Sequence, residues 1–125
     1  MNLVTQIFAI VAALFHIGAF VMESILFRRP AVQTVFVGAG EATPALRLFA
    51  FNQGFYNLFL AAGPVAGLIA AGTGHESAGR ALVVYSCAFM AACGVVLAVS
   101  SPRLWRAAVG QSGPPLIALI AALLA

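Results

Sequence analysis

Long apolar runs constrain this chain more than any other feature of its sequence. The first run, Leu3 to Phe27, holds about 25 mostly apolar residues, enough for a helix to cross a hydrocarbon core about 30 Å thick. Of the chain's 125 residues, 63% are hydrophobic and only 7% are charged, far outside the range of soluble proteins. The sequence therefore predicts a single all-α domain embedded in a membrane.

Four such segments are expected to form an up-and-down, four-helix transmembrane bundle. They cover approximately residues 3–27, 44–71, 81–100 and 104–125. Thr43 followed by Pro44 is typical of a helix start. Between the helices, Ala31–Thr43 is expected to be a loop and Gly72–Gly79 a turn. Pro114–Pro115 is expected to kink or divide the fourth helix.

The placement of arginine predicts the orientation of the bundle. The ends of the first and third connections carry four arginines: Arg28, Arg29, Arg103 and Arg106. The second connection offers only Arg80 against Glu76. The positive-inside rule therefore predicts cytoplasmic first and third loops and outside termini, with the chain in the cell inner membrane. The chain has no basic run of the kind that nucleic acid attracts, so nucleic acid is not an expected partner.

A cluster of amide and phenol side chains interrupts the second apolar segment. The spacing of four polar residues gathers them onto one broad stripe of a helix: Asn52, Gln53, Tyr56 and Asn57. Unpaired polar groups are costly in hydrocarbon, so this stripe is expected to face protein or water rather than lipid. Two interpretations stay open: the stripe joins neighbouring helices by hydrogen bonds, or it lines a binding or reaction pocket.

The first segment carries two ionisable residues, His16 and Glu23. They lie two helical turns apart and are therefore expected on one face. Since the first two helices are antiparallel, counting from their shared end places Glu23 level with the start of the polar stripe. The same count places His16 about one turn from Asn57. A pocket open to the cytoplasmic side is expected between these helices, with Arg47 at its mouth.

These residues suggest chemical roles. Glu23 is a candidate proton acceptor or an anchor for a cationic or hydroxylated ligand; a structural ion pair with Arg28 or Arg47 is the alternative. Tyr56 is a candidate donor to an oxygen that develops negative charge. The candidate catalytic residues are thus Glu23, His16 and Tyr56, and the candidate ligand-binding residues are Asn52, Gln53, Asn57 and Arg47.

His16 has several open roles. It is a candidate for proton transfer or for axial ligation of haem, whereas a structural hydrogen bond to Asn57 is the simpler interpretation. No second His or Cys falls at ligand spacing, so no metal site is expected. Cys87 and Cys93 lie about 9 Å apart along a helix axis, too far to bridge, and are expected to be small core residues.

Three stretches resemble the signature of a known family. They are HIGAFVME (His16–Glu23), the following LFRRP, and NQGFYNLFLAAG (Asn52–Gly63). The family comprises small bacterial four-helix membrane proteins catalogued as a domain of unknown function, DUF1304. The resemblance covers nearly the whole chain. It implies the four-span architecture and includes in the signature His16, Glu23, Asn52, Gln53, Tyr56 and Asn57, but it implies no settled activity.

A weaker resemblance is to membrane glutathione transferases and eicosanoid synthases, which are trimers of four-helix bundles. Arg47 and Asn52 are similar to the Arg and Asn on the second helix of that superfamily, but Phe55 or Tyr56 stands where its acidic residue would be. The departure argues against glutathione use. Membrane epoxide isomerases, also small haem-binding four-helix trimers, are similar in architecture alone.

The expected function is binding or transformation of a small lipophilic molecule in an intramembrane polar pocket. The alternatives are a small oligomeric transporter or channel, or a structural membrane subunit. Beyond Asn57 the second segment becomes apolar, which favours a one-sided pocket over a path across the membrane. A bundle of this length has little internal volume, so a homo-oligomer such as a trimer is expected to help form the cavity.

Overall fold

The structure is a computed structural model that describes residues 1–40 and 42–125. In this part of the chain, helices follow one another with short connections, which confirms the all-α class. In chain order they are α1 (Leu3–Phe20), the π-helical turn η1 (Val21–Ile25), α2 (Pro30–Val37), α3 (Pro44–Gly72), α4 (Glu76–Ser100), the 3₁₀ turn η2 (Pro102–Leu104) and α5 (Trp105–Leu123).

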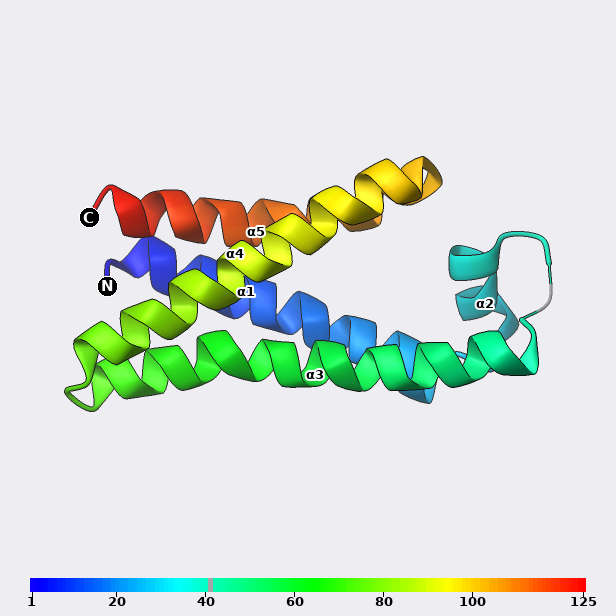
Figure 1. The fold of residues 1–125 in the computed structure, drawn as a ribbon, viewed down its shortest axis with the longest axis horizontal. Coiled ribbons are helices and arrows are strands. Elements are labelled where there is room, and N and C mark those ends of the chain that lie inside the picture. Colours follow the sequence, from blue (N-terminus) through cyan, green and yellow to red (C-terminus); the bar gives the residue numbers. More distant parts are fainter. Residues whose placement is uncertain (41) are drawn as a thin grey trace.

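Four long helices lie lengthwise beside one another, and α2 lies apart at one end (Figure 1). Helix α3 packs against α1 and α4, and α5 packs against the same two helices. Both chain ends and the α3–α4 turn lie at one end of the bundle, whereas η1, η2 and the start of α3 lie toward the other. The connections that carry most of the arginines therefore share one end of the molecule.

Within the described residues, three helical segments are long and apolar enough to span a membrane: Leu3–Ile25, Pro44–Gly72 and Glu76–Ser100. This finding supports a membrane protein. The expected fourth span, α5, is not among them. It has 19 residues, but Arg106, Gln111 and the two prolines, Pro114 and Pro115, lower its apolar character.

The structure corrects three expectations about local structure. Ala31–Thr43 is not simply a loop, because Pro30 begins α2, where its fixed φ suits the first helical position. Gly72–Gly79 is not a single turn, because α4 already begins at Glu76, whose carboxylate favours a helix amino end. Pro114–Pro115 does not divide α5, which runs on as one helix through both prolines.

Glycine–serine contacts set two helix crossings near the arginine-rich end. The Ser24 side chain lies where a Cβ on Gly54 would stand, and Ser24 Oγ donates to the Phe51 carbonyl oxygen at 2.7 Å. The Ser112 side chain meets Gly94 in the same way. Its Oγ donates to the carbonyl oxygen of Ala91, also three residues before the glycine, at 3.0 Å. Small residues let the backbones approach closely, as is usual between membrane helices.

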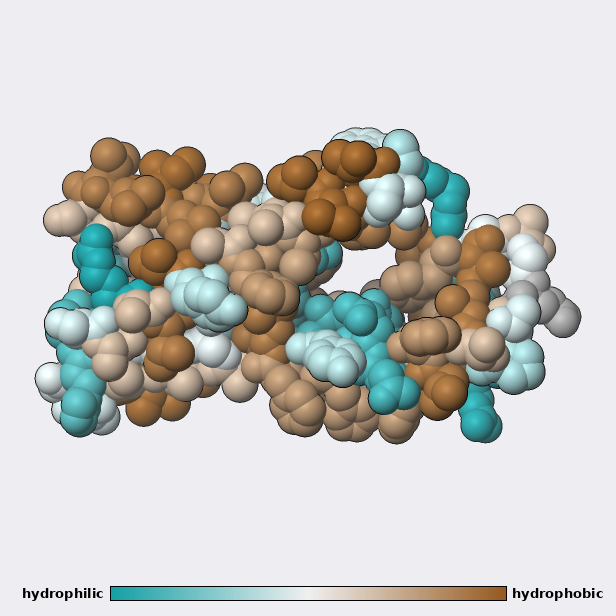
Figure 2. Space-filling view, viewed as in Figure 1, coloured by the Kyte–Doolittle hydropathy of each residue, from teal (hydrophilic) through white to brown (hydrophobic). Residues whose placement is uncertain are grey.

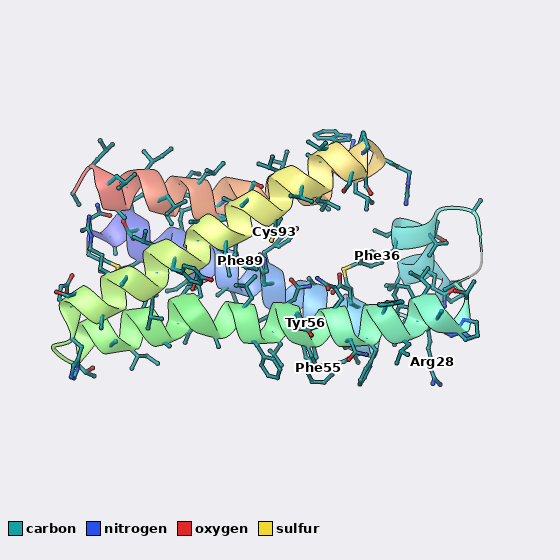
Figure 3. All side chains as sticks on the ribbon, viewed as in Figure 1. Arg28, Phe36, Phe55, Tyr56, Phe89 and Cys93 are labelled. Atoms are coloured by element: carbon teal, nitrogen blue, oxygen red, sulfur yellow. The ribbon has the colours of Figure 1, made fainter. Side chains whose placement is uncertain are left out.

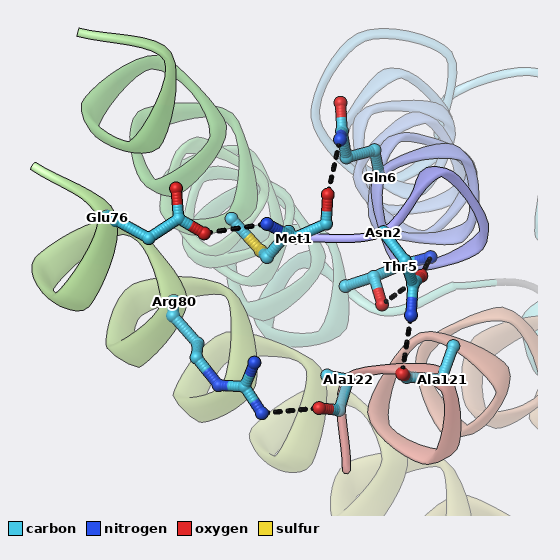
Figure 4. Close-up of polar contacts among 8 residues, drawn as sticks. All are labelled: Met1, Asn2, Thr5, Gln6, Glu76, Arg80, Ala121 and Ala122. Carbon is cyan, nitrogen blue, oxygen red and sulfur yellow. Dashed lines mark hydrogen bonds and ion pairs between the residues drawn. The ribbon is translucent and has the colours of Figure 1, made fainter. Parts of the chain in front are cut away.

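The opposite half of the bundle is tightly packed. Its core contains four side chains that are at most 1% exposed: Ala9, Val83, Cys87 and Ala118. At the end of this half, polar contacts join α1, α4 and α5 (Figure 4). The Met1 ammonium donates to Glu76 Oε1 at 2.6 Å, Asn2 Nδ2 donates to the Ala121 carbonyl oxygen at 2.7 Å, and Arg80 donates to the Ala122 carbonyl.

Candidate functional site

A cavity of about 640 Å³ occupies the half of the molecule that contains η1. The space-filling view shows the molecule hollowed between α2, α3 and the carboxyl end of α4, with hydrophilic residues on the rim (Figure 2). Its wall is mostly apolar, and every helix contributes to it. Its lining includes Phe15, Gly18, Met22, Glu23, Val35, Phe36, Gln53, Asn57, Cys93, Leu104 and Gln111. We call this space the main cavity.

Glu23 and Asn57 form the polar centre of the main cavity. Asn57 Nδ2 donates to Glu23 Oε2 at 2.8 Å and also lies 3.2 Å from the Gln53 carbonyl oxygen. Glu23 sits in η1, where the Leu26 N–H donates to the Val21 carbonyl oxygen, five residues back, at 2.8 Å. Such π-helical turns are frequent at functional sites. The structure thus brings together one predicted residue from each of the first two long helices.

A second hollow of about 360 Å³ adjoins the main cavity between α3 and α4. The two spaces share four lining residues: Gln53, Asn57, Cys93 and Gln111. Tyr56, Leu60 and Phe89 line the second hollow only, and Tyr56 is 69% exposed. We call it the lateral hollow. Tyr56 therefore lines the hollow next to the main cavity and not the wall that contains Glu23.

Two other predicted residues lie outside the main cavity. Asn52 is exposed, and its Nδ2 donates to the Leu48 carbonyl oxygen of its own helix at 3.0 Å. Arg47 Nη1 donates to the Ala42 carbonyl oxygen at 2.8 Å, and the side chain lines a crevice of about 250 Å³ together with Glu23 and Arg28. Glu23 thus separates this crevice from the main cavity, and Arg47 lies on the far side of it.

His16 is not part of the cavity wall. Its imidazole is 1% exposed on the face of α1 that also buries Ala9, Ala12 and Ala13. Its Nδ1 lies 3.1 Å from the Ala12 carbonyl oxygen, whereas Nε2 is buried without a hydrogen-bond partner in the described part of the chain. The sequence suggested a structural hydrogen bond from His16 to Asn57. In the structure, His16 contacts the Ala12 carbonyl oxygen instead. A porphyrin could reach this imidazole only if the helices around it repacked.

Two findings explain why His16 and Glu23 do not converge. The cavity is lined by Phe15 and Gly18 of α1 and by Met22 of η1, and the α1 residues lie to the side of the His16 face. The π-helical turn then under-winds the chain around Glu23, so a register based on 3.6 residues per turn no longer holds there.

Comparison with known proteins places this architecture in a family. The family model described as "Protein of unknown function (DUF1304)" matches residues 10–123, which is nearly the whole chain. The chain belongs to the DUF1304 family. Searches of curated proteins and of solved structures found no match. The resemblance seen in the sequence is thus confirmed, and the weaker likeness to membrane glutathione transferases has no support.

The site of this DUF1304 protein contains residues that sequence reasoning missed. Cys93 was expected in the core but lines both hollows, and Gln111 of α5 lines both as well. Gln111 could have been found as an amide in an otherwise apolar segment. Phe36 could not, because its segment was expected to be a loop. Figure 3 shows Cys93 on α4 and Phe36 on α2 on opposite sides of the main cavity.

Arg103 of the DUF1304 chain ties α2 across the end of the main cavity. Its Nη1 and Nη2 donate to the carbonyl oxygens of Val35 and Phe36, at 3.1 and 2.9 Å. Val35 and Phe36 line the main cavity, as does Leu104 beside the arginine. Arg103 therefore pairs with free carbonyls at the carboxyl end of α2, where a cation is favourable. It joins α2 to the α4–α5 connection.

Replacing Arg103 with alanine is expected to loosen α2 without unfolding the bundle. The two hydrogen bonds to carbonyls of α2 would be lost, while the packing of Phe36 against Phe27 would remain. We expect hydrogen exchange in Pro30–Val37 to rise by about tenfold, which corresponds to the loss of about 1.4 kcal/mol of local stability. Unchanged exchange in α2 would contradict this role, and Arg106→Ala is the matched control.

Proposed function

We propose that this protein binds a small lipophilic molecule in the main cavity, with the Glu23–Asn57 pair as its polar anchor. One observation carries the proposal: a paired carboxylate and amide at the centre of a large apolar hollow. Small-molecule sites have about 300–1,000 Å³ of space and combine apolar walls with a few converging polar groups. The main cavity, at about 640 Å³, fits that description.

The lateral hollow supports access from the bilayer. Its outer residues are exposed on the surface of the bundle, with Tyr56 at 69% and Phe89 at 47%. The α3 and α4 helices that flank it are both long and apolar enough to span a membrane. A lipophilic molecule dissolved in the bilayer would thus reach Gln53 and Asn57 by moving between these helices. The Tyr56 hydroxyl could meet a polar group of that molecule on the way.

The packing of the other half supports a binding site over a transport path. A path would have to continue from the main cavity toward the chain ends, but Ala9, Val83, Cys87 and Ala118 fill that region and are at most 1% exposed. The backbones of α3 and α4 also approach closely there, at Gly67 and Gly79.

Our proposal includes a membrane arrangement. Helix α5 is a fourth span, because it packs along α1 and α4 over its length and carries Trp105 and Arg106 at the arginine-rich end. That end faces the cytoplasm of a bacterial cell, with both termini on the other side of the inner membrane. Copies of the chain associate as a homo-oligomer such as a trimer.

The Asn57→Leu variant tests the proposed binding site. We expect native mass spectrometry of the purified protein to show a co-purifying lipophilic molecule, and this substitution to reduce its occupancy by at least about tenfold. The reason is that Asn57 holds Glu23 and lines both hollows, so its loss removes the polar anchor.

Asn52→Leu is the matched control. Asn52 is an amide on the same helix, but it bonds to Leu48 of that helix and lies outside the cavity wall. Its replacement should leave occupancy unchanged. Equal loss of ligand in both variants would show that the amides stabilise the bundle rather than a site, and ligand retained in Asn57→Leu would remove the pair from the binding role.

A further inference from the structure

Glu23 faces the main cavity without a positive partner of its own. Residues 1–40 and 42–125 include every arginine and histidine of the chain. In these residues, no arginine or histidine side-chain nitrogen lies within 4.0 Å of the Glu23 carboxylate. The ion pair with Arg28 or Arg47 that the sequence allowed is therefore not made. An ionised carboxylate in apolar surroundings is costly unless a counter-charge accompanies it. The charge balance of the cavity wall favours a positive ligand.

The hydrogen bonds of the polar pair leave acceptors for such a ligand. Asn57 Nδ2 is occupied by Glu23 Oε2 and the Gln53 carbonyl oxygen. Glu23 Oε1 and Asn57 Oδ1 have no hydrogen bond in the described chain, so both remain able to accept. Two oxygen acceptors, one of them on a carboxylate, suit a group that donates several hydrogen bonds. An ammonium group is such a donor.

The cavity wall suits the rest of a cationic molecule. Phe15 from α1 and Phe36 from α2 line it, and aromatic faces attract cations as well as apolar groups. All six arginines have described positions, and none of them lines the main cavity. Arg28 and Arg47 lie in the separate crevice beyond Glu23. An anionic ligand would therefore meet a carboxylate in the main cavity with no arginine in its wall.

We propose that the ligand class of the main cavity is a lipophilic amine, bound as its ammonium ion between Glu23 Oε1 and Asn57 Oδ1 with its apolar body against Phe15 and Phe36. This inference rests on the proposed function, since it names the chemistry of the molecule that the cavity takes. It adds that charge, and not only apolar volume, selects the ligand.

Three probes with one apolar body and different head groups test the inference: 4-phenylbutylamine, 4-phenylbutan-1-ol and 5-phenylpentanoate. Their binding is measured by titration calorimetry at neutral pH, on the full chain in nanodiscs of zwitterionic lipid, so that the lipid surface does not concentrate the amine. We expect the amine to bind at least about tenfold more tightly than the alcohol, and the carboxylate most weakly, because hydrogen bonds to a charged group are the stronger kind.

Two variants assign the selectivity to Glu23. In Glu23→Gln the amine should lose its advantage and bind no more tightly than the alcohol does to the same variant. Glu23→Asp keeps the charge and should keep the order of the three probes. Circular dichroism and size-exclusion chromatography check that each variant is folded, and the comparison of probes on the unsubstituted chain stands even if a variant is not.

The outcomes separate this inference from the proposed function. Equal binding of the amine and the alcohol, or an amine preference that survives in Glu23→Gln, would overturn the ligand class while leaving the cavity a binding site. If none of the three probes bound above the level of empty nanodiscs, the proposed function would fail together with the inference.

Discussion

Replacing Gly79 with leucine is expected to prevent the helices from packing. A Cβ at this position would lie 2.6 Å from the Ala71 backbone nitrogen and 2.8 Å from Ala71 Cβ, and it would also meet the Gly67 carbonyl. Backbone atoms of α3 cannot move aside as the end of a flexible side chain would. The helices would have to separate near their turn, at a cost of at least about 3 kcal/mol. Thermal unfolding followed by size-exclusion chromatography in detergent measures the effect.

Gly72→Leu is the control for this prediction. Gly72 ends α3 close to the same turn, yet a Cβ added to it meets nothing within 4 Å. It should unfold within about 0.5 kcal/mol of the original chain. If Gly79→Leu were as stable as Gly72→Leu, this result would contradict the close approach of the α3 and α4 backbones at Gly79.

Replacing Gly18 with phenylalanine is expected to abolish ligand binding while the bundle stays folded. Gly18 lines the main cavity from α1, and a Cβ added there meets nothing within 4 Å. The new ring would occupy space that the ligand needs, whereas glycine is itself unfavourable within a helix, so the helix should gain stability. We expect at least about a hundredfold loss of affinity for the co-purifying molecule, or about 2.7 kcal/mol.

Gly72→Phe is the control for a general effect of an added ring. A Cβ at Gly72 also meets nothing within 4 Å, but Gly72 lies at the end of α3 that is distant from the main cavity. It should bind as the original chain does. Undiminished binding in Gly18→Phe, with the fold intact, would show that the ligand lies elsewhere.

The membrane character of the chain followed from its sequence, and so did most of α1, α3 and α4. Apolar runs of this length have few stable alternatives, because a helix satisfies its own backbone hydrogen bonds in hydrocarbon. Helix ends were harder to predict. The predicted loop Ala31–Thr43 overlaps α2, which begins at Pro30, and the predicted turn Gly72–Gly79 overlaps α4, which begins at Glu76. Both residues are common at helix starts, so local pattern alone left two assignments open.

The sequence by itself determined that the first two apolar segments would bring polar side chains to a shared space: Glu23, Gln53 and Asn57 line the main cavity, whereas Asn52 and Tyr56 lie outside it. It could not determine which of them meet. The π-helical turn at Glu23 changes the helical register. The contact between Ser24 and Gly54 fixes the relative axial position of η1 and α3. Both depend on contacts between segments distant in the chain. For this reason only the tertiary structure decided that Glu23 pairs with Asn57 and that His16 is buried away from the cavity. It also decided that Cys93 and Gln111 line the same hollow.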